Sequence, residues 1–183
     1  MRLIVNVVMI AATLLYPLVV FFGRDYFEPR KIASLLLALL LARLAASYFR
    51  NHWSTPLLIA GISYSVFAMW HNQLDTLLFY PVLVNGLMLI IFGWSLFFPP
   101  SLIERLARQQ HPDLPPGAII YTRRVTQAWC GFFIINGVLA WVTSVWASLE
   151  VWSLYNGLIA YLLMGILFAV EYLIRMRTQT HVS

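Results

Sequence analysis

The sequence contains few charged residues and a single cysteine. Asp, Glu, Lys and Arg make up 10% of its 183 residues, whereas a soluble domain carries about 25%. So little charged surface cannot cover a water-soluble globule, which excludes an ordinary soluble domain. The lone Cys130 lies within an apolar stretch and cannot form an internal disulfide. The four histidines show no metal-ligand spacing, so we expect no metal site.

Long apolar runs are what the sequence has in abundance. Apolar residues make up 61% of the chain, and a helix of about 20 such residues crosses a hydrocarbon core of roughly 30 Å. The runs are continuous and do not alternate, which excludes a transmembrane β-barrel. We therefore predict an all-α fold, a polytopic transmembrane helical bundle that forms one integral membrane domain over residues 1–183. Its six spans are expected at residues 3–22, 32–49, 54–70, 77–98, 126–147 and 151–174.

The basic residues predict the orientation of these spans. The net charge is +5, and nine of the twelve Lys and Arg residues fall on the side of the membrane that holds both termini. Positive charge favours the cytoplasmic side, so we predict a bacterial inner-membrane protein with cytoplasmic N- and C-termini. The charge is thereby assigned to topology and anionic lipid, and not to nucleic acid. The predicted inner set is Arg2, Arg43, Arg50, Arg105, Arg108, Arg123, Arg124, Arg175 and Arg177, and the outer set is Arg24, Arg30 and Lys31.

Three Asn-Gly pairs lie inside predicted spans, beginning at Asn85, Asn136 and Asn156. A tight turn at these places would leave backbone groups without partners in lipid. We interpret the pairs as packing sites, where Gly lets two helices approach and the Asn amide bonds to a neighbouring helix. A polar ligand site lined by the three Asn side chains is the alternative.

Other polar and aromatic residues mark the ends of the runs. Glu171 precedes Arg175 by four residues, which predicts an ion pair on one helix face; a proton relay at Glu171 is the alternative. Five tryptophans close to predicted span ends indicate an interfacial aromatic belt, namely Trp53, Trp70, Trp129, Trp146 and Trp152. A quinone or pigment site built from aromatic residues is the alternative.

The most polar connection is the inner-face segment, residues 99–124. Ser101 followed by Glu104 predicts a capping box that starts a short amphipathic helix, which can lie in the membrane interface. Residues 111–117 contain three prolines and are expected to form a stiff linker. The segment offers a candidate site for a lipid headgroup or a partner, formed by Arg105, Arg108, Arg123 and Arg124. One alternative is a helix that only sets the topology. The other is an acid–base pair formed by His111 and Asp113.

Several apolar sequence stretches in these regions resemble stretches found in known families. The stretches PLVVFF at 17–22, SLIERL at 101–106 and QAWCGFFIING at 127–137 resemble the intracellular septation protein A family of small inner-membrane proteins. The stretches at 97–107 and 121–133 more closely resemble an uncharacterised bacterial membrane-protein family. Its members are often encoded among genes for aryl-polyene (xanthomonadin-type) pigment synthesis. Neither resemblance implies a catalytic residue.

These observations lead to an expected function. No span carries a central charge and no loop holds a nucleophile with a base, so we assign no catalytic residue and no cofactor. We expect a non-catalytic accessory that supports cell-envelope lipid or aryl-polyene-type pigment synthesis, in contact with membrane lipids and other envelope-synthesis proteins. One alternative is a small transporter or flippase for a lipid-linked product, which would need to form a homo-oligomer. The other is a membrane enzyme that acts on a lipid carrier.

Overall fold

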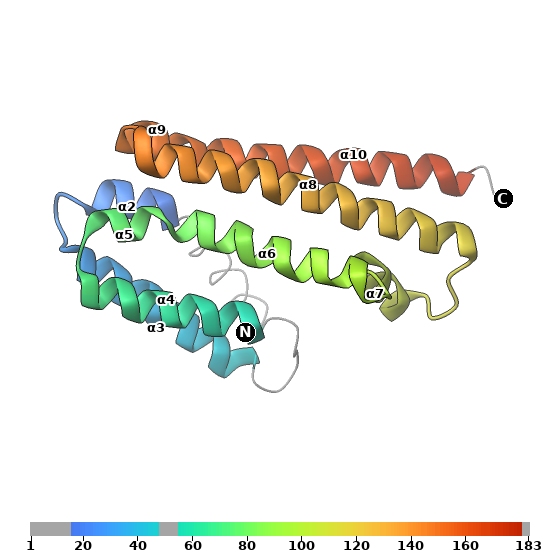
Figure 1. The fold of residues 1–183 in the computed structure, drawn as a ribbon, viewed down its shortest axis with the longest axis horizontal. Coiled ribbons are helices and arrows are strands. Elements are labelled where there is room, and N and C mark those ends of the chain that lie inside the picture. The colour runs from blue at the N-terminus through green and yellow to red at the C-terminus, as the bar shows by residue number, and fades with distance from the viewer. Residues whose placement is uncertain (1–15, 48–54, 181–183) are drawn as a thin grey trace. The chain divides into compact units, whose positions relative to one another are not determined.

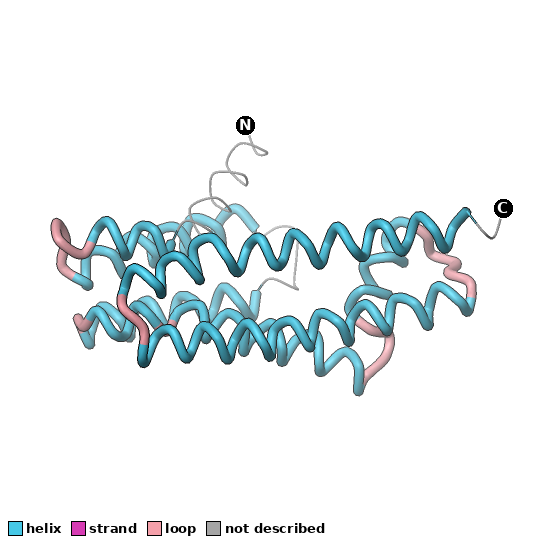
Figure 2. The backbone as a smooth tube through the Cα atoms, turned by 90° about the horizontal axis from the view of Figure 1, so that it is seen from above, coloured by secondary structure: helices cyan, strands magenta, loops and turns pink. Residues whose placement is uncertain are grey.

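The computed structural model describes residues 16–47 and 55–180, and within these ranges the chain is helical (Figure 1). Short loops join the helices, and no strand occurs in the described parts (Figure 2). The predicted all-α fold is therefore confirmed. The elements are α2 (Tyr16–Gly23), α3 (Pro29–Ser47), α4 (Thr55–His71), α5 (Leu74–Leu78), α6 (Tyr80–Phe97), α7 (Leu102–Gln110), α8 (Pro116–Trp146), α9 (Leu149–Leu154), the π-helix η2 (Tyr155–Ile159) and α10 (Ala160–Thr180).

Three helical segments of the described chain are long and apolar enough to cross a membrane. They are Leu74–Phe97, Pro116–Trp146 and Leu149–Met176, and they contain or overlap the last three predicted spans. α3 and the shorter apolar α4 coincide with the second and third apolar runs. Most of the first run lies outside the described residues. The structure thus has three candidate membrane-spanning helices, and the count of six stays a prediction.

Two compact units make up the chain. The first comprises Met1–Val84 and Ala140–Ile159, and the second comprises Asn85–Leu139 and Ala160–Ser183. α6 and α8 each contribute residues to both units. That the whole chain forms one membrane domain stays a prediction.

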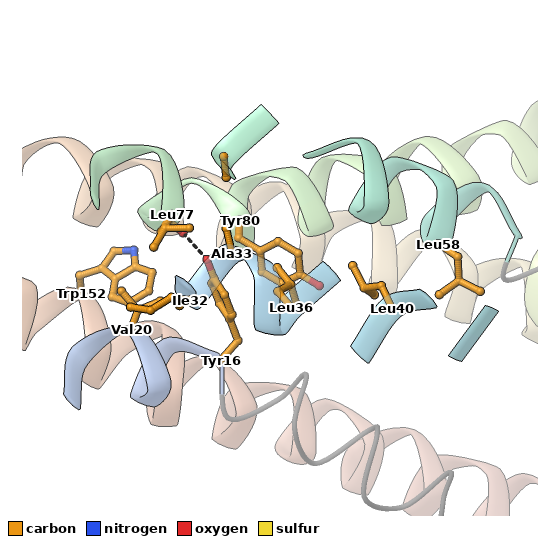
Figure 3. Close-up of a cluster of buried hydrophobic side chains, with 11 residues drawn as sticks. Tyr16, Val20, Ile32, Ala33, Leu36, Leu40, Leu58, Leu77, Tyr80 and Trp152 are labelled. Carbon is orange, nitrogen blue, oxygen red and sulfur yellow. Dashed lines mark hydrogen bonds between the residues drawn. The ribbon is translucent and has the colours of Figure 1, made fainter. Parts of the chain in front are cut away.

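An apolar core fills the first unit. Figure 3 shows side chains of α2, α3, α5, α6 and α9 converging on it. α3 and α4 pack closely, because a Cβ atom added to Gly61 would lie 3.0 Å from Leu40 Cδ1. The buried side chains are Tyr16, Val20, Ile32, Ala33, Leu36, Leu40, Leu58, Ala68, Leu77, Tyr80 and Trp152.

The loop after α4 ties α3 and α4 together at one end. Asn72 has a φ of 49°, in the left-handed region that Asn tolerates better than most residues. Its side-chain oxygen accepts a hydrogen bond from the backbone N–H of Arg30 at 2.9 Å, so it caps the first turn of α3. In return, Arg30 Nε donates to the carbonyl of Met69 in the last turn of α4, at 3.2 Å.

Aromatic rings hold the helices of the second unit together. The Trp129 ring of α8 lies 4.6 Å from the ring of Phe168 on α10 and 6.2 Å from that of Phe92 on α6, centroid to centroid.

α8 begins at Pro116, ten residues before the predicted span. Proline is favoured in the first turn of a helix, where its missing N–H has no partner to lose. The predicted linker is therefore shorter than expected, and Arg123 and Arg124 lie on a helix.

Candidate functional site

The break between α5 and α6 gathers polar side chains within the first unit. Pro81 has no N–H, so the carbonyl of Leu77 one turn earlier lacks its usual helical donor. The hydroxyl of Tyr16 donates to this carbonyl at 3.2 Å (Figure 3). The hydroxyl of Tyr64 donates to the neighbouring carbonyl of Thr76. A broken helix is tolerated in a bilayer when its backbone groups are satisfied in this way.

Trp152 completes the same arrangement from α9. Its side chain is 0% exposed, and its Nε1 donates to the carbonyl of Leu78 at 3.0 Å. Ser144 Oγ lies 2.9 Å from the same carbonyl. The prediction that Trp152 belongs to an interfacial belt is wrong, and so is that for the buried Trp129, because both rings fill helix contacts. Of the remaining belt candidates, Trp70 and Trp146 are exposed and Trp53 lies outside the described residues.

Asn156 lies in the π-helix that interrupts the last apolar segment. Its Nδ2 donates to Thr143 Oγ1 at 3.1 Å and to the carbonyl of Trp152 at 3.0 Å. A π-helix shifts the backbone bonding by one residue, and such turns are frequent at functional sites. Here the shifted region is occupied by protein: a Cβ atom on Gly157 would lie 3.3 Å from Leu18 Cδ2. No sequence signal marked the π-helix.

The other two predicted asparagines meet in the second unit. Nδ2 of Asn136 on α8 donates to Oδ1 of Asn85 on α6 at 3.0 Å, and both side chains are buried. A Cβ atom on Gly137 would lie only 3.2 Å from Asn85 Cβ. A Cβ atom on Gly86 would have nothing within 4 Å. The helices thus approach at Gly137 but not at Gly86, and Asn156 bonds within the first unit instead of joining this pair.

The short helix α7 begins at Leu102, and Ser101 precedes it as the N-cap residue, as the sequence predicted, but without a capping box. The Ser101 side chain makes no cap bond to the first turn. Instead, the hydroxyl of Ser95 on α6 accepts from the N–H of Leu102 at 2.9 Å, and the hydroxyl of Thr126 on α8 accepts from the N–H of Ile103 at 3.4 Å. The first N–H groups of α7 are therefore capped by hydroxyls of two other helices and not by Ser101. Both hydroxyls lie within the second unit.

Two of the predicted arginines are engaged with the protein itself. Arg105 donates to the carbonyls of Pro100 at 2.6 Å and Phe98 at 3.0 Å, next to the C-terminal end of α6. Arg108 forms an ion pair with Glu104 at 2.8 Å, and the Glu104 side chain is only 8% exposed. Arg108 also donates to the carbonyl of Pro112 at 3.1 Å.

The other two predicted arginines, Arg123 and Arg124, are exposed on the first part of α8. Within the described ranges, neither forms a hydrogen bond or ion pair. Two residues before them, the Tyr121 hydroxyl lies 3.2 Å from a carboxylate oxygen of Glu171, which joins α8 to α10. Glu171 also pairs with Arg175 at 4.0 Å, which confirms the predicted same-face ion pair.

The remaining candidate chemistry finds little geometric support. His111 and Asp113 are both exposed, and no hydrogen bond or ion pair joins them in the described part of the chain. Among the described residues, no three His, Cys, Asp or Glu side chains lie close enough to hold a metal ion.

Searches against protein-family models, curated proteins and solved structures return no match to this sequence. The function is therefore argued from the residues and their arrangement.

Proposed function

We propose that this chain is a non-catalytic accessory protein of a bacterial inner membrane, with six spans and both termini in the cytoplasm. It supports the synthesis of an envelope lipid or of an aryl-polyene-type pigment, and it binds an anionic lipid headgroup at its inner face. The proposal includes the family resemblance, to membrane proteins of aryl-polyene gene clusters and more distantly to septation protein A.

The observation that carries this proposal is that the buried polar side chains bond to one another and to backbone carbonyls. The Asn85 and Asn136 amides bond to each other, and Tyr16 and Trp152 bond to backbone carbonyls. In the described chain, Ser101 Oγ is the one buried side-chain oxygen or nitrogen without a partner. An enzyme or transporter needs polar groups directed at a substrate, whereas these groups stabilise helix packing.

Charge at the inner face supports a headgroup partner. Arg123 and Arg124 are exposed at consecutive positions on a helix long enough to cross a bilayer. Each basic residue near an anionic membrane surface contributes about 1 kcal/mol of attraction. Guanidinium groups also bind phosphate oxygens in a bidentate manner. These two arginines are the immediate headgroup contacts, because Arg105 and Arg108 bond within the protein.

Complementation of a deletion strain tests the proposal. The double variant Arg123→Gln/Arg124→Gln should insert normally but fail to restore the wild-type lipid and pigment profile, measured by lipidomics and pigment extraction. The control is Arg24→Gln, which removes one exposed charge from the predicted outer side and should complement. A double variant that inserts and complements fully would contradict headgroup binding at this pair.

A further inference from the structure

The contact between the first part of α8 and the last part of α10 contains a carboxylate that uses one of its two oxygens. The hydroxyl of Tyr121 on α8 donates to the carbonyl of Glu171 at 3.1 Å and to its Oε1 at 3.2 Å. Arg175 Nε lies 4.0 Å from the same Oε1. Among the described residues, no hydrogen bond reaches Oε2 of Glu171, and this oxygen is not buried. An accessible acceptor therefore lies beside the two helices.

The guanidinium of Arg175 is also accessible next to this carboxylate. Its side chain is 50% exposed, and one face of the group lies over the ring of Tyr172, 5.6 Å from the centroid. In the described part of the chain, its two terminal nitrogens donate no hydrogen bond. Such an edge of paired N–H groups can bind two oxygens of a phosphate at once.

Helical geometry places Arg124, and not Arg123, next to the same contact. Both side chains are exposed. At about 100° per residue, Arg124 lies about 60° around α8 from Tyr121, and Arg123 lies about 160° around it. Residues three apart are neighbours on a helix surface. Arg124 therefore borders the side of α8 that meets α10, whereas Arg123 lies on the far side.

The directions of the two helices bring their arginines to a common level. Trp129, which follows Tyr121 on α8, contacts Phe168, which precedes Glu171 on α10, so the helices run antiparallel here. Side chains of a helix lean toward the N-terminus of their own helix. The two arginines thus lean from opposite directions toward the level of the bond between Tyr121 and Glu171.

The charge of this group limits the ligands that suit it. The guanidinium groups of Arg124 and Arg175 and the carboxylate of Glu171 together leave one net positive charge. One phosphodiester anion neutralises that charge. A zwitterionic headgroup brings no net charge, and a phosphomonoester brings a second negative charge close to the carboxylate, which repels it. A hydroxyl group on the ligand could donate to the accessible Oε2.

We propose that Arg124, Arg175 and Glu171 bind the headgroup of a phosphodiester lipid that carries hydroxyl groups, with the chemistry of phosphatidylglycerol. The phosphate lies between the two guanidinium groups, and a headgroup hydroxyl donates to Oε2. The three residues lie near the start of one candidate span and near the end of another, where a lipid phosphate is found. The inference rests on the headgroup site proposed above and names its ligand.

Binding of short-chain lipids to the full chain in an uncharged detergent tests the proposal. Isothermal titration compares phosphatidylglycerol with phosphatidic acid, a phosphomonoester without headgroup hydroxyls, and with zwitterionic phosphatidylethanolamine. Phosphatidylglycerol should bind about tenfold more tightly than either, the factor that corresponds to one hydrogen bond to a charged group. Glycerophosphoglycerol, the same headgroup without acyl chains, should bind more weakly. Equal binding of this soluble ester would overturn the assignment to a lipid.

Five variants test the assigned residues. Arg124→Gln and Arg175→Gln should each weaken binding of phosphatidylglycerol by about tenfold, and Arg123→Gln, the neighbouring matched variant, should weaken it less. Glu171→Met keeps the side-chain length but has no oxygen, and it should lose the preference over phosphatidic acid. Tyr121→Phe breaks the same contact between α8 and α10 but leaves the carboxylate, so it should keep that preference. Melting curves show that each variant is folded.

Three results would overturn the inference. The first is equal affinity of the parent for phosphatidylglycerol and phosphatidic acid. The second is a Glu171→Met variant that keeps the parent's preference, or a Tyr121→Phe variant that loses it, because the helix contact and not the carboxylate would then matter. The third is equal weakening by Arg123→Gln and Arg124→Gln, because binding would then depend on charge alone.

The same measurements separate this inference from the proposed function. If one of the three results is obtained while Arg123→Gln/Arg124→Gln still fails to complement, the assignment of the ligand is wrong and the proposed function stands. If the lipid preference and its loss in Glu171→Met are observed while that double variant complements, the lipid site stands without the proposed role in envelope synthesis.

Discussion

The contact between Gly137 and Asn85 gives the sharpest test of how α6 and α8 are held together. A Cβ atom at Gly137 would approach Asn85 Cβ to 3.2 Å, closer than side chains comfortably pack. Gly137→Leu should therefore force the helices apart and cost about 1–3 kcal/mol, the usual range for overpacking. The matched control is Gly86→Leu, in an identical Asn-Gly pair where an added Cβ atom meets nothing within 4 Å.

Asn136→Leu measures the hydrogen bond at the same contact. This variant removes the donor to Asn85 Oδ1, and interhelical polar bonds in membranes contribute about 0.6–2 kcal/mol. For a chain of this size, 1 kcal/mol shifts the melting temperature by about 2–4 °C. We expect the melting temperature in detergent to fall by about 1–8 °C for Asn136→Leu, by more for Gly137→Leu, and by little for Gly86→Leu.

The melting temperature is measured by size-exclusion chromatography of heated samples. Tryptophan fluorescence detects the protein that stays folded. A Gly137→Leu protein that melts together with Gly86→Leu would refute close packing at this pair. If Asn136→Leu melts like the parent but loses complementing activity, the Asn85–Asn136 pair serves a polar ligand and not helix packing.

Two further outcomes follow from the helix break and from the charge distribution. Trp152→Phe removes the Nε1 bonds to the Leu78 carbonyl and to Ser144 Oγ and leaves part of a fully buried site empty. The melting temperature should therefore fall by more than the about 2–4 °C that corresponds to roughly 1 kcal/mol for one hydrogen bond; an unchanged melting curve would contradict the buried position of this ring. Alkaline phosphatase fused after Ser183 should be inactive and fused after Gln73 should be active, and activity at Ser183 would contradict the cytoplasmic C-terminus.

The positions of the helices could be predicted from the sequence because apolar runs of this length have few other stable forms. The places where helices bend or start early depend on single residues in a tertiary setting. Pro81 removes the helical donor to the carbonyl of Leu77, and Tyr16 supplies one in its place. Trp152 donates to the next carbonyl, that of Leu78, and neither Tyr16 nor Trp152 is near Pro81 in sequence. Similarly, α8 begins at Pro116, within the stretch 111–117 that was expected to be a linker and ten residues before the predicted span.

Among the candidate residues, contacts within one helix could be predicted from the sequence, whereas contacts between helices could not. The ion pair of Glu171 with Arg175 is set by helical spacing alone, and the structure confirms it. The pairing of Asn136 with Asn85, and the tertiary caps of α7, join residues from different helices. No pattern within one segment specifies which distant group will be its partner, so the Ser101 capping box was expected where Ser95 and Thr126 act.

α8 is longer than a single crossing of a bilayer requires. Its 31 residues extend about 46 Å at the rise of an α-helix, which exceeds a hydrocarbon core of roughly 30 Å. The first third of the helix, with Tyr121, Arg123 and Arg124, therefore stands beyond the acyl chains when the apolar remainder fills the core. In a thicker bilayer the helix has less room to tilt, and these charges are drawn toward the hydrocarbon. If α8 crosses a membrane, bilayers of different thickness would hold the two arginines at different depths.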